Sequence, residues 1–71
     1  MYAEALKEIK KASEIEKEDP LILEHLGDVY IKLDNREAAI KAWEASLEFQ
    51  EKEEGLKERI EEKIENLRKS Q

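Results

Sequence analysis

The stretch PLILEHLGDVYIKL, residues 20–33, has a counterpart 34 positions later in EGLKERIEEKIENL, residues 54–67. Apolar residues recur at corresponding positions: Ile22 and Leu56, Leu26 and Ile60, Tyr30 and Ile64, and Leu33 and Leu67. The segment before it repeats with the same period: Ala5 and Ala39, Leu6 and Ile40, Ile9 and Trp43, Ala12 and Ser46, and Ile15 and Phe49. A fixed period of this length is typical of stacked helical hairpins, none of which buries its apolar face alone. The sequence therefore predicts an all-α fold of four helices, arranged as antiparallel hairpins stacked in a short α-solenoid.

Length and composition limit the class of protein. The 71 residues suffice for one small domain, whose core is marginal without added cross-links, and no cysteine is present to supply a disulfide or a thiolate metal ligand. Charged residues make up 45% of the chain, but the apolar residues between them are periodic. This periodicity indicates charged outer faces around a narrow core rather than disorder.

The charge balance bears on partners and location. The formal net charge is -6, whereas nucleic acids and anionic membranes attract clustered lysine and arginine, so neither is an expected partner. No apolar run approaches the roughly 18 residues of a membrane-spanning helix, and the first residues lack the apolar core of a signal peptide. The default expectation for the compartment is therefore the cytoplasm.

Helix boundaries are indicated by local capping signals. The spacing predicts a first helix over residues 2–17, with one apolar stripe formed by Tyr2, Ala5, Leu6, Ile9, Ala12 and Ile15. Asp19-Pro20 then marks the start of a second helix, because Asp accepts from the free amides of a first turn and Pro needs no partner there. Asp34 suits the left-handed backbone that ends a helix, and Asn35 can cap the next one.

The second helix, residues 20–33, differs from the others because apolar residues surround most of its circumference. We expect it to be the central element, covered by the other three helices. A third helix is expected over residues 36–50, with a buried face of Ala39, Ile40, Trp43, Ser46, Leu47 and Phe49. A fourth helix over residues 55–69 carries a single apolar stripe of Leu56, Ile60, Ile64 and Leu67. This suits a terminal helix, whose opposite, polar face is exposed to solvent.

The boundary between the third and fourth helices allows two interpretations. Residues 51–54 are compatible with a helix, and Gly55 is the only breaker there. The 34-residue register places a turn near residues 52–55. A continuous helix from residue 36 to residue 69 is the competing interpretation.

Two motifs resemble the tetratricopeptide repeat family. Leu23-x-x-Leu26-Gly27-x-x-Tyr30, followed by Ala39-x-x-x-Trp43, is similar to the family pattern of W-x-x-L-G-x-x-Y followed by A-x-x-x-F. The resemblance implies one domain over residues 1–71 with a right-handed solenoid fold. It divides the chain into the second helix of a partial repeat (2–17), a complete repeat (20–52) and a capping helix (55–69). The chain departs from the pattern at Leu23, Asp34 and Ser46, where Trp, Gly and Ala are common.

What the resemblance implies for function is a peptide- or protein-binding groove lined by the first helix of each hairpin. On this chain the groove residues would be Leu21, Glu24, Asp28, Ile31 and Lys32, with Glu58 and Glu62 added from the fourth helix. Glu24 and Asp28 stand where donors for a terminal carboxylate would be useful, which disfavours that ligand. The acidic, partly apolar strip instead favours a basic or mixed apolar segment.

Close packing gives a physical reason for Gly27. A glycine inside a helix costs about 1 kcal/mol relative to alanine, so we expect the third helix to approach the second one closely at this point. Its counterpart 34 residues later is Glu61, as expected if no further helix packs on the fourth.

No constellation of residues points to catalysis, and no metal or cofactor site is predicted. His25 and Asp28 lie one turn apart, but His25 is the only histidine and no cysteine exists to raise metal affinity. No serine has a histidine nearby in the sequence, and the two glycines form no phosphate-binding loop. The chain is therefore predicted not to be an enzyme.

Two functional hypotheses of different classes remain. The first is a module that binds a protein or peptide. The second is a self-assembling structural unit that forms homo-oligomers through the uncovered flank of its first helix, because that helix lacks the first half of its own hairpin.

Overall fold

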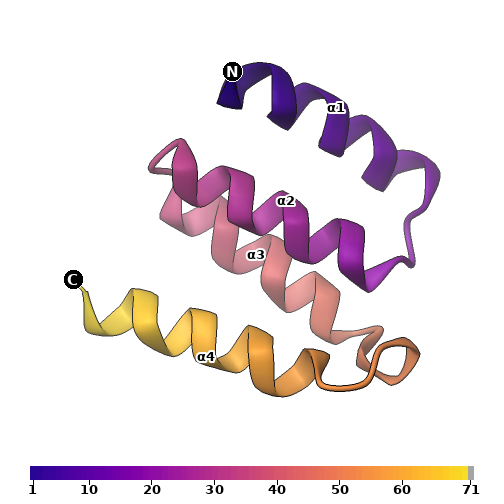
Figure 1. The fold of residues 1–71 in the computed structure, drawn as a ribbon, viewed down its shortest axis with the longest axis vertical. Helices are drawn as coiled ribbons and strands as arrows, with labels where there is room; N and C mark the ends of the chain where they lie inside the picture. Colours follow the sequence, from indigo (N-terminus) through magenta and orange to yellow (C-terminus); the bar gives the residue numbers. More distant parts are fainter. Residues whose placement is uncertain (71) are drawn as a thin grey trace.

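Four α-helices make up the fold of residues 1–70, the part of the chain that this computed structural model describes. They are α1 (Tyr2–Ile15), α2 (Pro20–Lys32), α3 (Arg36–Leu47) and α4 (Leu56–Lys69), with a short 3-10 turn η1 at Gln50–Lys52. Each α-helix runs antiparallel to the next, α2 and α3 lie in the middle, and α1 and α4 form the two edges (Figure 1). The described chain fills a flat volume of 30 × 27 × 15 Å.

Capping residues start α2 and α3 as the sequence predicts. Asp19 Oδ1 accepts from the backbone N–H groups of Leu21 and Ile22 at 3.0 and 3.3 Å, and Pro20 follows as the first helical residue. Asn35 Oδ1 accepts from the N–H of Ala38 at 3.2 Å. These caps fix the positions at which the chain enters the two central helices.

The turn between α2 and α3 contains the expected left-handed residue. Asp34 has a φ of +59°, a conformation that costs an L-residue energy because its Cβ approaches the backbone. The chain can thereby reverse within three residues, so that α3 lies directly against α2.

A break separates α3 from α4, so the interpretation of one helix over residues 36–69 is wrong. Gly55 has a φ of +82°, which ends any continuous helical path immediately before Leu56. α3 also ends at Leu47, earlier than expected, because the N–H groups of Glu48 and Phe49 bond three residues back, to Ala45 and Ser46. The last turn therefore tightens and leaves the α-helical path before residue 50.

The core lies between α2, α3 and α4. It contains Ala39 and Trp43 of α3 and Leu56, Ile60 and Ile64 of α4, with Tyr30, Ile31, Leu47 and Leu67 packed against it. The predicted apolar stripe of α4 is thus confirmed. Glu61, the counterpart of Gly27, is exposed.

Gly27 makes the predicted close approach between α2 and α3. A Cβ added at Gly27 would lie 2.3 Å from both Cδ1 and Nε1 of Trp43. The indole stands directly on the α2 backbone and donates from Nε1 to the Glu24 carbonyl oxygen and to Asp28 Oδ1, each at 3.2 Å. A second tie joins the helices where Ser46, buried as predicted for a small residue, donates from Oγ to the Pro20 carbonyl oxygen at 2.7 Å.

The apolar stripe of α1 is only partly covered, in agreement with the open flank that the sequence predicts for this helix. No residue of α1 is buried; Ile15 is 72% exposed and Tyr2 is 49% exposed. Ala5, Leu6, Ile9 and Ala12 are only half-buried. The physical reason is that α1 has a single helical neighbour, α2, so one side of its stripe remains open.

Candidate functional site

A groove between α2 and α4 is the candidate site. It has a volume of about 480 Å³, and its lining residues are Asp28, Ile31, Lys32, Trp43, Lys63, Asn66 and Leu67. Ile31, Leu67 and the buried Trp43 supply the apolar part, and Lys32 and Asn66 supply polar groups. An apolar lining with a few polar groups is the usual composition of a ligand-binding groove.

An ion-pair network crosses the wall of this groove from α2 to α4. Arg59 donates to Glu24 through Nε at 2.7 Å and through Nη2 at 2.8 Å, a bidentate geometry. Lys63 Nζ donates to Glu24 Oε2 at 2.8 Å and to the two carboxylate oxygens of Asp28 at 2.9 and 3.0 Å. Because both carboxylates have internal cationic partners, the local charges are largely neutralised within the chain.

The network fixes the charge states of its members. The hydrogen bonds from Arg59 lower the pKa of Glu24 from 4.5 to about 2; burial opposes this shift, and Lys63 adds to it. Burial also acts to lower the pKa of Lys63, but the hydrogen bonds that Lys63 donates to Glu24 and Asp28 outweigh burial and raise this pKa. Glu24 is only 7% exposed. It is therefore a charged group held inside the protein wall rather than one presented to solvent.

The other predicted site residues lie at the surface. Leu21 is 46% exposed at the start of α2, and Lys32 is exposed at its end. Ile31 is half-buried in the groove lining. Glu58 and Glu62 are exposed on α4, and no ion pair is found for either within residues 1–70. Of the predicted residues, Asp28, Ile31 and Lys32 line the groove together, whereas Leu21, Glu24, Glu58 and Glu62 do not.

Sequence reasoning missed Arg59 and Lys63 as members of the ion-pair network, and Lys63 and Asn66 as residues of the groove lining. A signal for the first two was present: Glu24 and Asp28 are four residues apart on α2, and Arg59 and Lys63 are four residues apart on α4. Residues spaced by four share one helix face, so the two pairs could have been matched by charge. The match needs an offset of 35 residues, one more than the repeat period.

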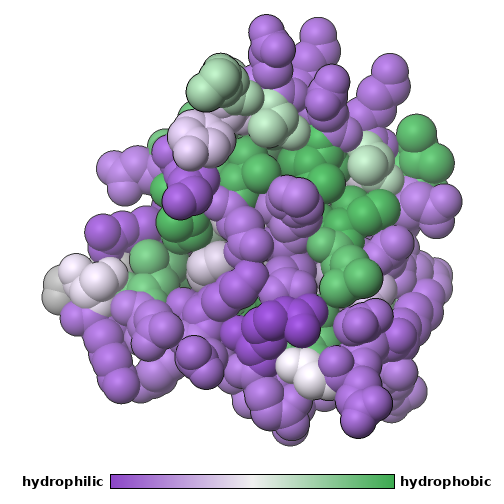
Figure 2. All heavy atoms as spheres, viewed as in Figure 1, coloured by the Kyte–Doolittle hydropathy of each residue, from purple (hydrophilic) through white to green (hydrophobic). Residues whose placement is uncertain are grey.

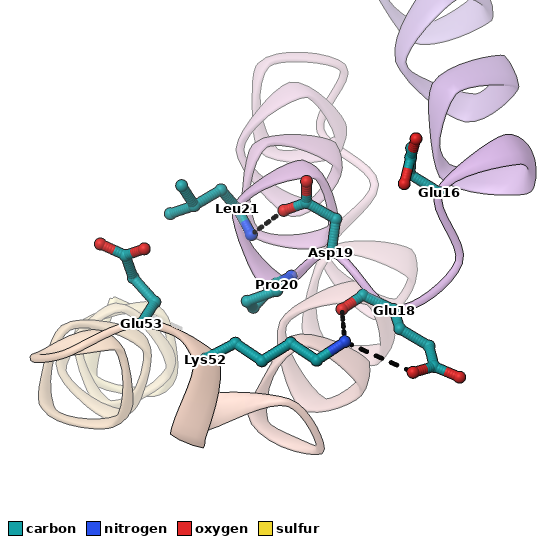
Figure 3. A pocket seen from close by; sticks show the side chains of 7 residues that line it. All are labelled: Glu16, Glu18, Asp19, Pro20, Leu21, Lys52 and Glu53. Carbon is teal, nitrogen blue, oxygen red and sulfur yellow. Dashed lines mark hydrogen bonds and ion pairs between the residues drawn. The ribbon is translucent and has the colours of Figure 1, made fainter.

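A second hollow, of about 370 Å³, lies at the other end of the helices where α1 turns into α2 (Figure 3). Its lining brings together Glu16, Glu18, Asp19 and Glu53 with one cation, Lys52. Lys52 Nζ donates to the carbonyl oxygen of Glu18 at 3.1 Å and to its Oε1 at 3.3 Å. This contact ties the α1–α2 loop to η1 across 34 residues, which gives the hollow a structural role.

Two further classes of site were sought in the described part of the chain. Residues 1–70 contain no group of three or more histidine, cysteine, aspartate or glutamate side chains placed to hold a metal ion. Within the same range, the helices are too short or too polar for any of them to cross a membrane.

Comparison of the chain with family models, with curated proteins and with solved structures finds no match. The α2–α4 groove and the surrounding charges are therefore the basis on which a function can be argued.

Proposed function

We propose that the chain is a non-enzymatic protein- or peptide-binding module of the tetratricopeptide repeat type, with its helices stacked as a short right-handed solenoid. The ligand lies along the α2–α4 groove. The observation that carries the proposal is the apolar groove lined by Ile31, Leu67 and Trp43, whose neighbouring carboxylates on α2 already have cationic partners.

Internal neutralisation changes the ligand chemistry that the groove favours. Glu24 and Asp28 are held by Arg59 and Lys63, so they attract a basic ligand less than their number suggests. A short segment with an apolar anchor residue fits the groove lining. Specificity for basic side chains then comes from Glu58 and Glu62, which are exposed on the same helix as Lys63.

The size of the groove sets the expected strength of binding. A standard protein interface buries roughly 800 Å² on each partner, about a sixth of the 5,109 Å² surface of the described chain. One groove between two helices of 13 and 14 residues offers less than this. We therefore expect a micromolar dissociation constant for a short peptide.

The test uses three fluorescein-labelled model peptides of equal length, composed of Leu and Lys, Ser and Lys, or Leu and Glu. Fluorescence anisotropy measures binding, and the emission of Trp43 reports entry of an apolar side chain into the groove. The Leu/Lys peptide should bind most tightly and perturb Trp43. Equal binding by the Ser/Lys peptide would show attraction to the net negative charge alone and would count against the groove.

A matched pair of charge variants locates the site. Glu58→Lys with Glu62→Lys should weaken binding of the Leu/Lys peptide by about tenfold, because two exposed carboxylates of α4 are replaced by charges of the same sign as the peptide's lysines. Glu44→Lys with Glu48→Lys makes the same change in net charge at exposed positions in α3 and its C-cap, and should have a much smaller effect. Equal losses in the two variants would refute the α2–α4 location.

A further inference from the structure

A second open surface lies between α1 and α2. Figure 2 shows apolar atoms gathered over α1 and α2, whereas the area over α4 is mostly hydrophilic. A groove of about 250 Å³ runs between α1 and α2, and its lining residues are Ala5, Glu8, Ile9, His25 and Val29.

The internal repeat identifies this surface as a position for a helix. α1 corresponds to α3 with a shift of 34 residues, and α3 has α2 on one side and α4 on the other. On α3, Ala39, Ala42, Trp43 and Ser46 are at most 6% exposed. None of their α1 counterparts, Ala5, Glu8, Ile9 and Ala12, is buried.

The 34-residue repeat also relates α4 to α2, which supplies the other wall of the groove. The residues of α4 that bond to α2 are Arg59 and Lys63, and their counterparts 34 residues earlier are His25 and Val29. These two residues therefore stand where a neighbouring helix would meet α2, and they line the open groove together with α1.

The polar groups of the groove are complementary to those of a rotated copy, since a carboxylate can accept a hydrogen bond from an imidazole N–H. Its single acidic residue, Glu8, comes from α1, and its single histidine, His25, comes from α2, and both are exposed. In a two-fold symmetric contact, residue i of one copy meets residue j of the other and the reverse holds as well. A two-fold axis through the groove can therefore set Glu8 of each copy against His25 of the other.

The exposed apolar side chains are distributed in a way that suits the same symmetry. Tyr2 and Leu33, 49% and 38% exposed, belong to the N-terminal end of α1 and the adjacent C-terminal end of α2. Ile15, 72% exposed, lies at the opposite end of α1. A two-fold rotation exchanges the two ends and brings apolar groups of one copy toward those of the other.

We propose that a second copy of this chain is the occupant of the α1–α2 face, which forms a symmetric dimer with Glu8 paired to His25 across the interface. The two helices are each about 20 Å long and present a face about 20 Å wide. This is the scale of a weak, reversible dimer rather than an obligate one. The proposal is independent of the peptide groove, because the two grooves have no lining residue in common.

Sedimentation equilibrium of the full chain from about 5 µM to about 1 mM tests the proposal. The average mass should rise with concentration from 8.4 kDa toward twice that value. A mass that stays at the monomer value throughout this range would overturn the dimer.

Two lysine substitutions test the face without endangering the fold. Ile15 is seven residues, about two turns, from Glu8 and therefore lies on the same face of α1, so Ile15→Lys places a charge beside the proposed interface and should weaken the dimer about tenfold or more. Ala3→Lys adds the same charge at an exposed position elsewhere on α1 and should leave the dimer unchanged. An added lysine reduces the net negative charge of each copy and so weakens the electrostatic repulsion between two copies. This repulsion therefore cannot explain a loss of the dimer. A dimer insensitive to Ile15→Lys would place the interface elsewhere.

A charge exchange tests the pairing itself. Glu8→Lys and His25→Glu, each alone, should weaken the dimer about fivefold, because each sets like or unpaired charges together. The double variant recreates opposite charges and should restore the wild-type constant within about twofold. Failure of the double variant to recover would refute the symmetric register. Glu58→Lys with Glu62→Lys should leave dimerisation unchanged, which separates this proposal from the peptide groove.

Discussion

Replacing Gly27 by alanine tests how α2 and α3 are held together. On helix propensity alone, the substitution should stabilise the protein by about 1 kcal/mol, because glycine is a poor residue for a helix interior. The structure predicts the opposite sign. The added methyl carbon would lie 2.3 Å from Cδ1 and Nε1 of Trp43 and 2.9 Å from Cε2, so the indole has to move.

The cost of that movement follows from the surroundings of Trp43. The side chain is 4% exposed, and overpacking of a core of this kind costs about 1–3 kcal/mol. Its Nε1 donates to Glu24 and Asp28 at 3.2 Å, and loss of these bonds adds about 1 kcal/mol. After the gain in propensity is subtracted, Gly27→Ala should destabilise the fold by about 1–3 kcal/mol, or about 7 °C in Tm for each kcal/mol in a chain of this length.

Urea denaturation followed by circular dichroism measures the change, since it does not depend on the tryptophan signal. The control is Trp43→Phe, alone and combined with Gly27→Ala. Phenylalanine keeps a Cδ1 but lacks Nε1 and the hydrogen bonds that hold the indole against α2, so its smaller ring can move away and alanine at residue 27 should be less harmful in the double variant. If Gly27→Ala alone raises stability, or if the two substitutions are additive, the close approach of Trp43 is not what the glycine serves.

Three further substitutions have expected outcomes. Glu24→Gln should lower the free energy of unfolding by about 2 kcal/mol at pH 7, because Arg59 loses a charged partner. Because folding lowers the pKa of Glu24 from 4.5 to about 2, its contribution to stability is present above pH 4.5 and is lost as the pH falls toward 2. The stability of the variant, measured by acid titration, should therefore change less with pH in that window than the stability of the wild type. Ser46→Ala should cost about 1 kcal/mol in thermal denaturation, because the 2.7 Å bond to the Pro20 carbonyl is lost, and a neutral result would reduce Ser46 to a packing residue. Asp34→Gly should raise stability by about 0.5–1 kcal/mol, because glycine adopts a φ of +59° without a Cβ clash; a decrease in Tm would contradict the expected strain.

The pattern of local residues was sufficient to predict the helices and most of their limits. The starts of α2 and α3 follow from Asp19 and Asn35, whose side chains act on amides two or three residues away. The break at Gly55 and the left-handed Asp34 are local features of the same kind. Such features can be recognised without a structure because the interacting groups are neighbours in the chain.

The α2–α4 site was only partly accessible from the sequence. Helical spacing places residues 28, 31 and 32 near one another on the second helix, and in the structure they line one groove. Spacing within a helix could not show that Glu24 lies against Arg59, because that contact joins residues 35 positions apart and depends on how α4 is rotated and displaced beside α2. The same limit explains Ile15, which matches a buried stripe by period but has no neighbour to cover it.

By itself, the order of residues determined which segments are helical and which side of each is apolar, because backbone hydrogen bonding, capping and periodicity act within a few residues. The tertiary structure decided which carboxylates are internally paired and which remain exposed, and which face of α1 is left open. Those outcomes depend on how separate helices are placed relative to one another. A shift of one residue in register, or packing against a different face of a helix, would change which groups are paired and which are exposed.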